Sequence, residues 1–231
     1  MTLNRPRIVA LLPMKANSER VAGKNFRDFC GKPLFRWILD TLLEVNAIDQ
    51  VVINTDARHI LAENGLVDSE RVLIRDRRQE ICGDLVSMNL VLADDVDNVD
   101  ADVYLMTHTT NPLLTAETIS NALDTFLEAR DKGHSDSLFT VNKVQTRFYR
   151  ADLSAVNHDP SNLVRTQDLE PWYEENSNLY AFTRASFRET NARIGRKPMM
   201  YENSRFESID IDTPEDWDFA VIAATYWVAQ S

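Results

Sequence analysis

Cationic side chains gather in one short segment of this 231-residue chain, directly after an apolar run near its N-terminus. Residues 14–25 include Lys15, Arg20 and Lys24, and Arg27 follows just beyond. At the carboxyl end of a strand, such a loop can hold a polyphosphate through its charges and its backbone N–H groups. Taken alone, a solvated basic loop explains the same residues equally well. The segment matches neither GxxxxGK[ST] nor GxGxxG, which argues against a P-loop NTPase and a dinucleotide-dependent dehydrogenase.

Two carboxylates, Asp210 and Asp212, stand two positions apart near the other end of the chain. If residues 206–211 form a strand, both side chains face the same side at its carboxyl end. Paired carboxylates beside a phosphate site suit Mg²⁺, which takes oxygen ligands from one or two carboxylates and from substrate phosphates. The competing interpretation is that Asp212 or Thr213 only caps the following helix.

Three further polar segments stand out: Asn54-Thr55-Asp56 at the end of one predicted strand, Arg75 to Arg78 before Gly83 and Asp84, and Thr107 to Pro112 at the end of another predicted strand. The first can simply cap a helix. The second could contact a phosphate or a base, although a charged surface turn is the commoner explanation. In the third, His108 could act as a general base, but a lone histidine is more often a structural hydrogen-bond partner.

The elements that must position these residues alternate along the chain. Apolar runs predict strands at 7–13, 50–54, 102–106, 137–141, 178–182 and 206–211. The strands at 7–13 and 50–54 have the pattern of strands buried within a parallel sheet. Helical spacing of apolar residues predicts helices near 34–43, 57–63, 85–96, 116–129 and 214–227, the last with Thr213 as N-cap. The pattern predicts an α/β fold with three αβα layers, Rossmann-like, with a mostly parallel sheet, in a single domain of residues 1–231. Ligands of such sheets lie beyond the carboxyl ends of the strands, here the loops after Pro13, Asn54 and Thr107.

The alternation fails from about residue 142 to residue 175, where aromatic, basic and proline residues are scattered without strong periodicity. We expect this excursion, 142–175, either to contact a partner subunit or to cover the site as a flap.

Composition and charge exclude several classes of protein. The chain is 44% hydrophobic and 26% charged, typical of a soluble globular protein. It has 36 acidic and 25 basic residues, a net charge of −11, which argues against binding to nucleic acid or to anionic membranes. Residues 14–27 and 71–78 nevertheless each carry four cations and one anion, so the acidity belongs to the remaining chain.

Other features indicate a cytoplasmic protein without a disulfide framework or a zinc site built from its histidines. No apolar run approaches the roughly 18 residues of a membrane span, and the N-terminus has the pattern of a strand rather than a signal peptide. Cys30 and Cys82 form no CxxC pair, and the four histidines lack zinc-ligand spacing.

In this order, the segments resemble the acylneuraminate cytidylyltransferase (CMP-sialic acid synthetase) family, to which CMP-3-deoxy-manno-octulosonate synthetase is related. The first loop is similar to the family's LPARGGSKGIPGKN at Pro13, Lys15, Ser18, Gly23, Lys24 and Asn25. The later matches are residues 54–56 to STD, Arg77 with Glu80 and Asp84 to RPAELASD, 109–115 to QPTSPLRT, 175–180 to ENGAIYI and 209–213 to DIDT. Together they run from about residue 8 to residue 218.

The resemblance implies a nucleotidyltransferase fold and a Mg²⁺-dependent transfer in which a hydroxyl of a sugar acid attacks the α-phosphorus of CTP and pyrophosphate leaves. It implies catalytic roles for Lys24, Lys15 and Asp212, metal binding by Asp210 and Asp212, and a homodimer joined by the excursion. The implied nucleotide-binding residues are Lys15, Asn17, Ser18, Lys24, Asn25, Asp56, Arg77 and Asp84. The implied acceptor-binding residues are His108, Thr109, Thr110, Asn111, Arg165 and Asn176.

Five positions depart from the family pattern: Glu19, Arg20, His108, Asn111 and Leu114. The last three lie on the family's sugar side, so CTP chemistry is better supported than N-acetylneuraminate as the acceptor. We therefore expect an acidic acceptor related to a nonulosonate. The alternatives are transfer to an octulosonate, a sugar phosphate or a phosphonate, and a non-catalytic nucleotide-binding domain.

Overall fold

The computed structural model describes residues 5–16, 18 and 21–228. The predicted nucleotide ligand Asn17 and the departures Glu19 and Arg20 lie outside these residues. No helix within the described ranges is long and apolar enough to cross a membrane.

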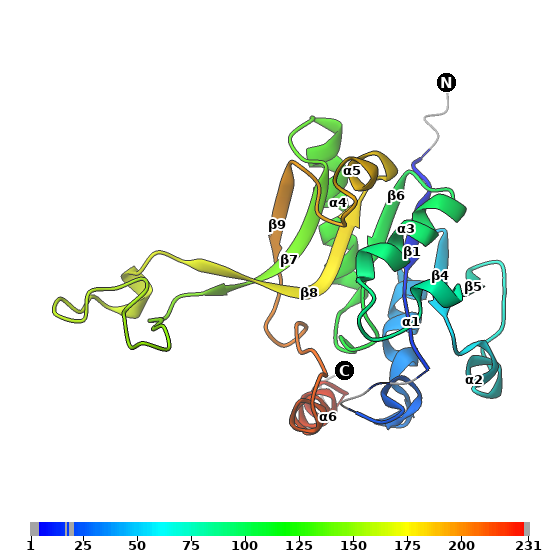
Figure 1. The fold of residues 1–231 in the computed structure, drawn as a ribbon, viewed down its shortest axis with the longest axis horizontal. Helices are drawn as coiled ribbons and strands as arrows, with labels where there is room; N and C mark the ends of the chain where they lie inside the picture. The colour runs from blue at the N-terminus through cyan, green and yellow to red at the C-terminus, as the bar shows by residue number, and fades with distance from the viewer. Residues whose placement is uncertain (1–4, 17, 19–20, 229–231) are drawn as a thin grey trace.

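A seven-stranded sheet in the order β5-β4-β1-β6-β8-β7-β9 runs through the protein (Figure 1). The strands are β1 (Ile8–Leu11), β4 (Gln50–Thr55), β5 (Val72–Asp76), β6 (Val103–Met106), β7 (Ser137–Val144), β8 (Trp172–Phe182) and β9 (Pro198–Glu202). The first four are parallel to one another, β8 is antiparallel to β6 and β7, and β9 is parallel to β7. The predicted mostly parallel sheet is confirmed.

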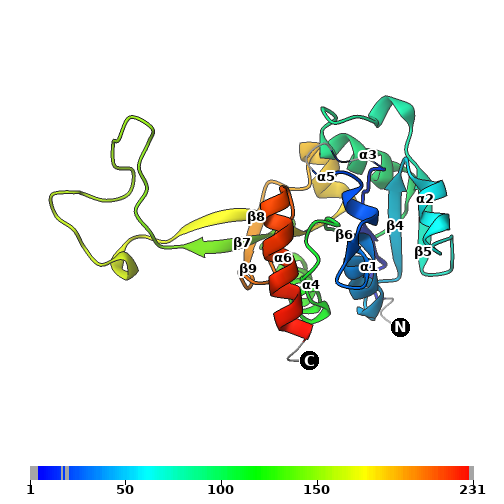
Figure 2. The ribbon, with the colours of Figure 1, turned by 90° about the horizontal axis from the view of Figure 1, so that it is seen from below.

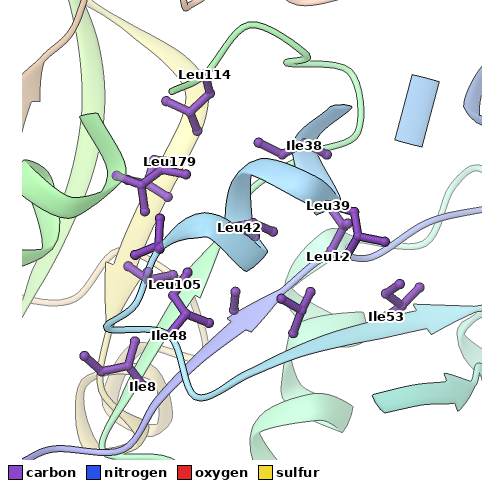
Figure 3. Close-up of a cluster of buried hydrophobic side chains, with 14 of the residues drawn as sticks. Ile8, Leu12, Ile38, Leu39, Leu42, Ile48, Ile53, Leu105, Leu114 and Leu179 are labelled. Atoms are coloured by element: carbon purple, nitrogen blue, oxygen red, sulfur yellow. The ribbon is translucent and has the colours of Figure 1, made fainter. Parts of the chain in front are cut away.

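Helices cover both faces of the sheet, as Figures 1 and 2 show. On one face lie α1 (Leu34–Glu44), α2 (Arg58–Glu63) and α4 (Ala116–Asp131), and on the other α3 (Met88–Asn98) and α5 (Arg184–Thr190). Side chains alternate along β1, so that Ile8 and Ala10 join the first core and Val9 and Leu11 the second. Figure 3 shows the first core, in which Ile38 and Leu42 of α1 lie among strand residues. The three-layer αβα architecture is therefore as predicted.

The last helix, α6 (Pro214–Val228), is anchored to the segment that follows β1. That segment contains the short helix η1 (Lys24–Phe26) and the two-stranded ribbon of β2 (Asp28–Phe29) and β3 (Lys32–Pro33). The rings of Phe29 and Trp217 meet edge to face with centroids 5.4 Å apart, and the guanidinium of Arg27 lies 4.3 Å from the centre of the Trp217 ring. This packing holds the residues before α6 against the first loop.

The outer parts of β7 and β8 leave the body as a long hairpin, which is most evident in Figure 2. We call residues 142–175 the arm. The predicted excursion is thus present, but its ends are paired strands, since Asn142 faces Glu174 and Val144 faces Trp172. Only 145–171 is irregular, apart from the short helix η3 (Thr166–Asp168) and an isolated bridge.

The structure corrects the prediction of a strand at 206–211. Residues 205–208 form a turn, closed by a hydrogen bond from the Ser208 N–H to the Ser204 carbonyl. The Ile211 N–H donates to the Thr110 carbonyl of a loop, so its backbone joins no sheet ladder.

Among the elements of five or more residues, β5, α5 and β9 were not predicted, and the shorter β2, β3 and 3-10 helices were missed as well. In β5 three apolar residues, 72–74, are followed by the charged Arg75 and Asp76, and Arg75 pairs with Asp94 and Asp95 of α3, which explains a strand that ends in a charged segment.

Candidate active site

A cavity of about 270 Å³ opens where the loops after β1, β5 and β6 meet the segment before α6. The predicted site residues that line it are Lys15, Ser18, Lys24, Asn25, Arg77, Asp84, His108, Thr109, Thr110 and Asp212. The prediction that functional loops follow Pro13 and Thr107 agrees with the position of this cavity. The loop after β4 contributes by supporting its neighbours instead of lining the cavity.

Hydrogen bonds between neighbouring segments hold the first loop in place. The carboxylate of Asp56 accepts a 2.7 Å hydrogen bond from the Ala16 N–H, so Asp56 acts on the loop backbone. Asn25 donates to the Lys15 carbonyl at 2.8 Å and accepts from the Thr109 hydroxyl at 2.7 Å. Asn25 therefore connects the loop after β1 to the loop after β6.

Lys15 and Lys24 bring positive charge to the cavity, in addition to Arg77. Lys15 forms an ion pair with Asp84 at 2.6 Å, and both side chains are partly exposed. The Nζ atom of Lys24 donates to the Ile211 carbonyl at 2.5 Å and lies 3.6 Å from Oδ1 of Asp212. Gly23, directly before Lys24, has φ of 59°, a left-handed conformation that glycine adopts at little cost. The turn at Gly23 thus directs a largely buried lysine toward the segment before α6.

The two carboxylates near the C-terminus occupy different environments. Asp212 lines the cavity, whereas Asp210 does not. Oδ1 of Asp210 is buried without a hydrogen-bond partner in the part of the chain that the structure describes. Burial raises the pKa of Asp210, a hydrogen bond with Thr110 lowers it, and the charge of Asp212 raises it again. The prediction that strand geometry brings the two together is wrong, because both lie in a loop.

The helix cap is formed by other groups than the Asp212 side chain. The Asp216 N–H donates to the Thr213 hydroxyl at 3.2 Å, and the Asp216 carboxylate accepts from the N–H groups of Thr213 and Asp212. Thr213 is therefore the N-cap, as predicted. The Asp212 carboxylate faces the cavity beside Lys24, so the capping interpretation does not account for it.

These carboxylates fit a hard divalent cation. A buried carboxylate oxygen without a partner among the described residues, close to a second carboxylate, is the kind of donor set that Mg²⁺ uses together with substrate phosphates. No group of three or more His, Cys, Asp or Glu side chains suited to a metal occurs in the described ranges. The protein ligands that this loop offers to a cation are therefore Asp210 and Asp212, and substrate oxygens would have to complete the shell.

Arg77 links the carboxyl ends of two strands beneath the cavity. Its guanidinium donates to the side-chain oxygen of Asn54 at 2.9 Å, to the Asn54 carbonyl at 2.7 Å and to the Met14 carbonyl at 3.3 Å. Burial lowers the pKa of Arg77. Most of the N–H groups of Arg77 are used in these hydrogen bonds within the protein. Arg77 therefore holds the cavity wall together and also lines it.

A buried charged network behind Arg77 was missed from the sequence. Asn54 donates to Asp95 at 2.8 Å, Asp95 pairs with Arg75, and Asp94 pairs with Arg75 at 3.0 Å and with Arg78 at 2.9 Å. The available signal was an acidic pair inside the apolar-spaced helix at 85–96, opposite a run of arginines.

The predicted acceptor residues divide into two groups. His108, Thr109 and Thr110 line the cavity, and burial lowers the pKa of His108 to about 4, with Arg193 and Lys24 acting in the same direction. The imidazole is therefore neutral at pH 7. Asn111 is fully buried and donates to the Ile209 carbonyl, so it does not line the cavity.

Three further positions lie away from the cavity. Asn176 accepts from Thr140 and donates to Asn142 and Asn203, which ties β8 to β7 and to the segment after β9. Arg165 lies on the arm and pairs with Asp168 at 2.7 Å. Leu114, a departure from the family pattern, packs in the first core with 1% exposure.

Comparison with known proteins agrees with this architecture. The chain matches the family model described as cytidylyltransferase over residues 9–222. It is 28% identical over 225 residues to the CMP-N,N'-diacetyllegionaminic acid synthase of Legionella pneumophila, covering 91% of this chain and 93% of the relative. It is 24% identical over 224 residues to the pseudaminic acid cytidylyltransferase of Campylobacter jejuni, covering 93% and 94%.

A solved structure shares the fold. It is a CMP:2-keto-3-deoxy-manno-octonic acid synthetase complexed with CTP, with a TM-score of 0.65 and 15% sequence identity, covering 95% of this chain and 99% of that chain. Since the family model spans nearly the whole sequence, the chain belongs to the cytidylyltransferase family and is a nucleotidyltransferase.

Proposed function

We propose that this protein transfers CMP from CTP to a hydroxyl group of an acidic, nonulosonate-like sugar and releases pyrophosphate. The observation that carries the proposal is the pairing of Lys24 with Asp212 in a cavity bordered by the predicted CTP residues. The relatives named for legionaminic acid and pseudaminic acid support this class of acceptor. A CTP-consuming biosynthetic step fits a protein of the cytoplasm.

Lys15 and Lys24 would bind the triphosphate. Lys24 is held by the Ile211 carbonyl, so its ammonium group is positioned before the substrate arrives. Lys15 would exchange its partly exposed ion pair with Asp84 for phosphate oxygens. Fixed charge directed at developing negative charge is the main source of acceleration in phosphoryl-type transfer. Ser18, Asn25 and Arg77 would complete the nucleotide side.

Asp212, together with Asp210, would hold Mg²⁺. The bound ion would neutralise charge on the phosphate and acceptor oxygens. Asp210 suits this role because it is buried and its Oδ1 atom has no hydrogen-bond partner among the described residues. Asp212 suits it because it lines the cavity.

His108, Thr109 and Thr110 would form the acceptor side of the cavity. A pKa of about 4 makes His108 a weak general base at pH 7, because an effective base has a pKa near the working pH. We therefore assign it a positioning role, in which a neutral ring nitrogen makes a hydrogen bond with the acceptor.

The arm would join two copies of the chain as a homodimer. It projects from the body and exposes large apolar side chains, among them Leu153 at 83% and Leu163 at 63%. Exposed apolar groups on a projecting hairpin are typical of an interaction surface. Arg165, being on the arm, could act only in the cavity of a second copy.

Pyrophosphate release tests the proposed function. The protein is incubated with CTP, Mg²⁺ and a panel of acceptors: N,N'-diacetyllegionaminic acid, pseudaminic acid, N-acetylneuraminate, an octulosonate, a sugar phosphate and a phosphonate. We expect turnover with at least one nonulosonate. Turnover only with a sugar phosphate or phosphonate would reassign the acceptor, and release with ATP or UTP but never with CTP would refute the nucleotide assignment.

A further inference from the structure

A second cavity, of about 260 Å³, neighbours the first, since Met88 lines both. Its remaining walls come from the start of α3, from β8 and from the loop after α5, which contribute four polar or charged side chains and two apolar ones: Ser87, Asn89, Glu175, Arg193, Ala192 and Ile194. The second cavity therefore extends the site in the direction of Arg193.

Two contacts hold the Arg193 side chain in place. Its guanidinium lies 4.0 Å from the centre of the Tyr180 ring, a distance at which the cation is attracted to the ring face. One guanidinium nitrogen lies 3.6 Å from Oε1 of Glu175, and the Tyr180 hydroxyl donates to the same carboxylate oxygen. The stacking fixes the group, whereas the 3.6 Å separation is too long for a good hydrogen bond. Arg193 is thus positioned but only loosely paired with Glu175.

The chemistry of the acceptor requires a cation close to the reacting phosphorus. In a 2-ulosonic acid the carboxylate and the attacking hydroxyl are attached to the same carbon atom. A group that binds the carboxylate must therefore lie beside the residues that surround the transfer, Lys24 and His108. Arg193 meets this condition, because it lines the cavity that shares Met88 with the cavity of Lys24 and His108. Its charge also contributes to lowering the pKa of His108.

Lys24 is a poor candidate for the carboxylate. It is engaged by the Ile211 carbonyl and lies beside Asp212, on the side of the cavity assigned to the triphosphate. Arg165 is on the arm and pairs there with Asp168. Arg193, in contrast, lines a cavity that adjoins the transfer site and keeps 20% of its side chain exposed.

We propose that Arg193 binds the carboxylate of the acceptor, that Glu175 is the internal partner which the acceptor replaces, and that the second cavity holds the acceptor. This inference rests on the proposed function. A guanidinium can bind a carboxylate through two parallel hydrogen bonds, which also fixes the orientation of the attacking hydroxyl. Arg193 is thus the residue that selects an acidic sugar over a neutral one.

The first test compares Arg193→Met with the wild type under steady-state conditions, with the panel acid that the wild type uses best. We expect the acceptor KM to rise about 10- to 100-fold, the range for losing a hydrogen-bonded charge pair, with a small change in the KM for CTP. Arg193→Lys should recover part of the loss. Arg196→Met is the matched control, because Arg196 lies in the same loop and pairs with Glu189 at 2.5 Å, outside both cavities.

Glu175→Gln separates substrate binding from a structural role. Glutamine keeps the hydrogen-bond acceptor for Tyr180 but removes the charge that competes with the acceptor for Arg193. If Arg193 binds the carboxylate, Glu175→Gln lowers the acceptor KM, opposite to Arg193→Met. If the pair only holds the fold together, both substitutions raise the KM and lower the melting temperature alike, which would overturn the inference.

The outcomes distinguish this inference from the proposed function. If the wild type uses none of the panel acids, both are refuted. If the wild type is active but Arg193→Met and Arg196→Met behave alike, the assignment of Arg193 fails while the proposed function stands. An equal rise in the KM for CTP would also contradict it, because Arg193 would then belong to the nucleotide side.

Discussion

The Nζ atom of Lys24 lies 3.6 Å from Oδ1 of Asp212, although the two residues come from opposite ends of the chain. Apolar packing behind them produces this contact, since Trp217 of α6 meets Phe29 of the ribbon that follows the first loop. The hydrogen bond from Lys24 to the Ile211 carbonyl then fixes the lysine on the same segment. The folded chain thus brings together the cation that we assign to the triphosphate and the carboxylate that we assign to the metal.

Lys24→Met should reduce kcat about 100- to 1000-fold, because one preorganised charge aimed at the transition state is typically worth that much. Methionine approximates the length of the buried stem, so the protein should still fold. Single-turnover formation of the CMP-sugar measures the chemical step directly. Lys15→Met, which removes a partly exposed cation, should cost less. A Lys24→Met variant impaired only in acceptor KM would show that the lysine has another role.

Asp212→Asn should abolish the dependence of the rate on Mg²⁺ together with most of the activity, because an amide is a much weaker ligand for Mg²⁺ than a carboxylate. Rates are measured over a titration of Mg²⁺. Asp218→Asn is the matched control, an exposed aspartate on the first turns of α6. Wild-type activity and an unchanged Mg²⁺ titration in Asp212→Asn would remove this residue from the metal site.

The stability of the protein should depend on pH through Asp95. Burial raises the pKa of this carboxyl group from 3.8 to about 6, against the lowering effects of Asn54 and Arg75. The folded state therefore binds the proton more tightly than the unfolded state. The contribution of Asp95 to the free energy of unfolding is fully present below about pH 4 and is lost as the pH rises through about 6. The linkage relation gives a change of about 3 kcal/mol in that free energy.

Urea unfolding of the wild type and of Asp95→Asn across pH 4 to 7 measures this effect. The free energy of unfolding of the wild type, relative to the variant, should rise as the pH falls from about 6 to about 4. Asp97→Asn, an exposed position on the same helix, controls for the loss of a charge. A difference between wild type and Asp95→Asn that is independent of pH would disagree with a raised pKa.

The oligomeric state should depend on the arm. Light scattering after size exclusion is expected to give twice the chain mass for the wild type and the mass of one chain for a Leu153→Arg, Leu163→Arg double variant. Val67→Arg, at an apolar position of the body that is 64% exposed, is the control and should leave the dimer intact. A monomeric wild type would refute the dimer, and a dimeric double variant would place the interface elsewhere.

The parts of the fold with a clear apolar pattern were predictable from the sequence. β1 and α1 bury almost every apolar residue that marked them, so local pattern and tertiary packing agree. β5 was missed because it ends in charged residues, and the pairs that hold Arg75 largely buried, with Asp94 and Asp95, are not revealed by a local pattern. The segment at 206–211 looked like a strand, but its backbone hydrogen bonds go to a turn and to the loop at Thr110.

The cavity-lining residues were found from the order of several motifs, because loops at the carboxyl ends of neighbouring strands must meet. Asn111 belonged to such a motif, yet its side chain is buried and donates a hydrogen bond to the Ile209 carbonyl instead of lining the cavity. Arg193 had no motif to mark it. Its proximity to His108 depends on how α5 and the following loop pack against β8, which the sequence pattern does not specify.

Transfer of the α-phosphorus tests the central claim most directly. The protein is incubated with Mg²⁺, the panel acid that it uses best and CTP labelled either at the α- or at the γ-phosphorus, and the products are separated. We expect the α label to appear in a CMP-sugar and the γ label in pyrophosphate, in equal amounts. Label from the γ position released as inorganic phosphate, with the α label retained in CDP, would show hydrolysis of CTP and contradict cytidylyl transfer.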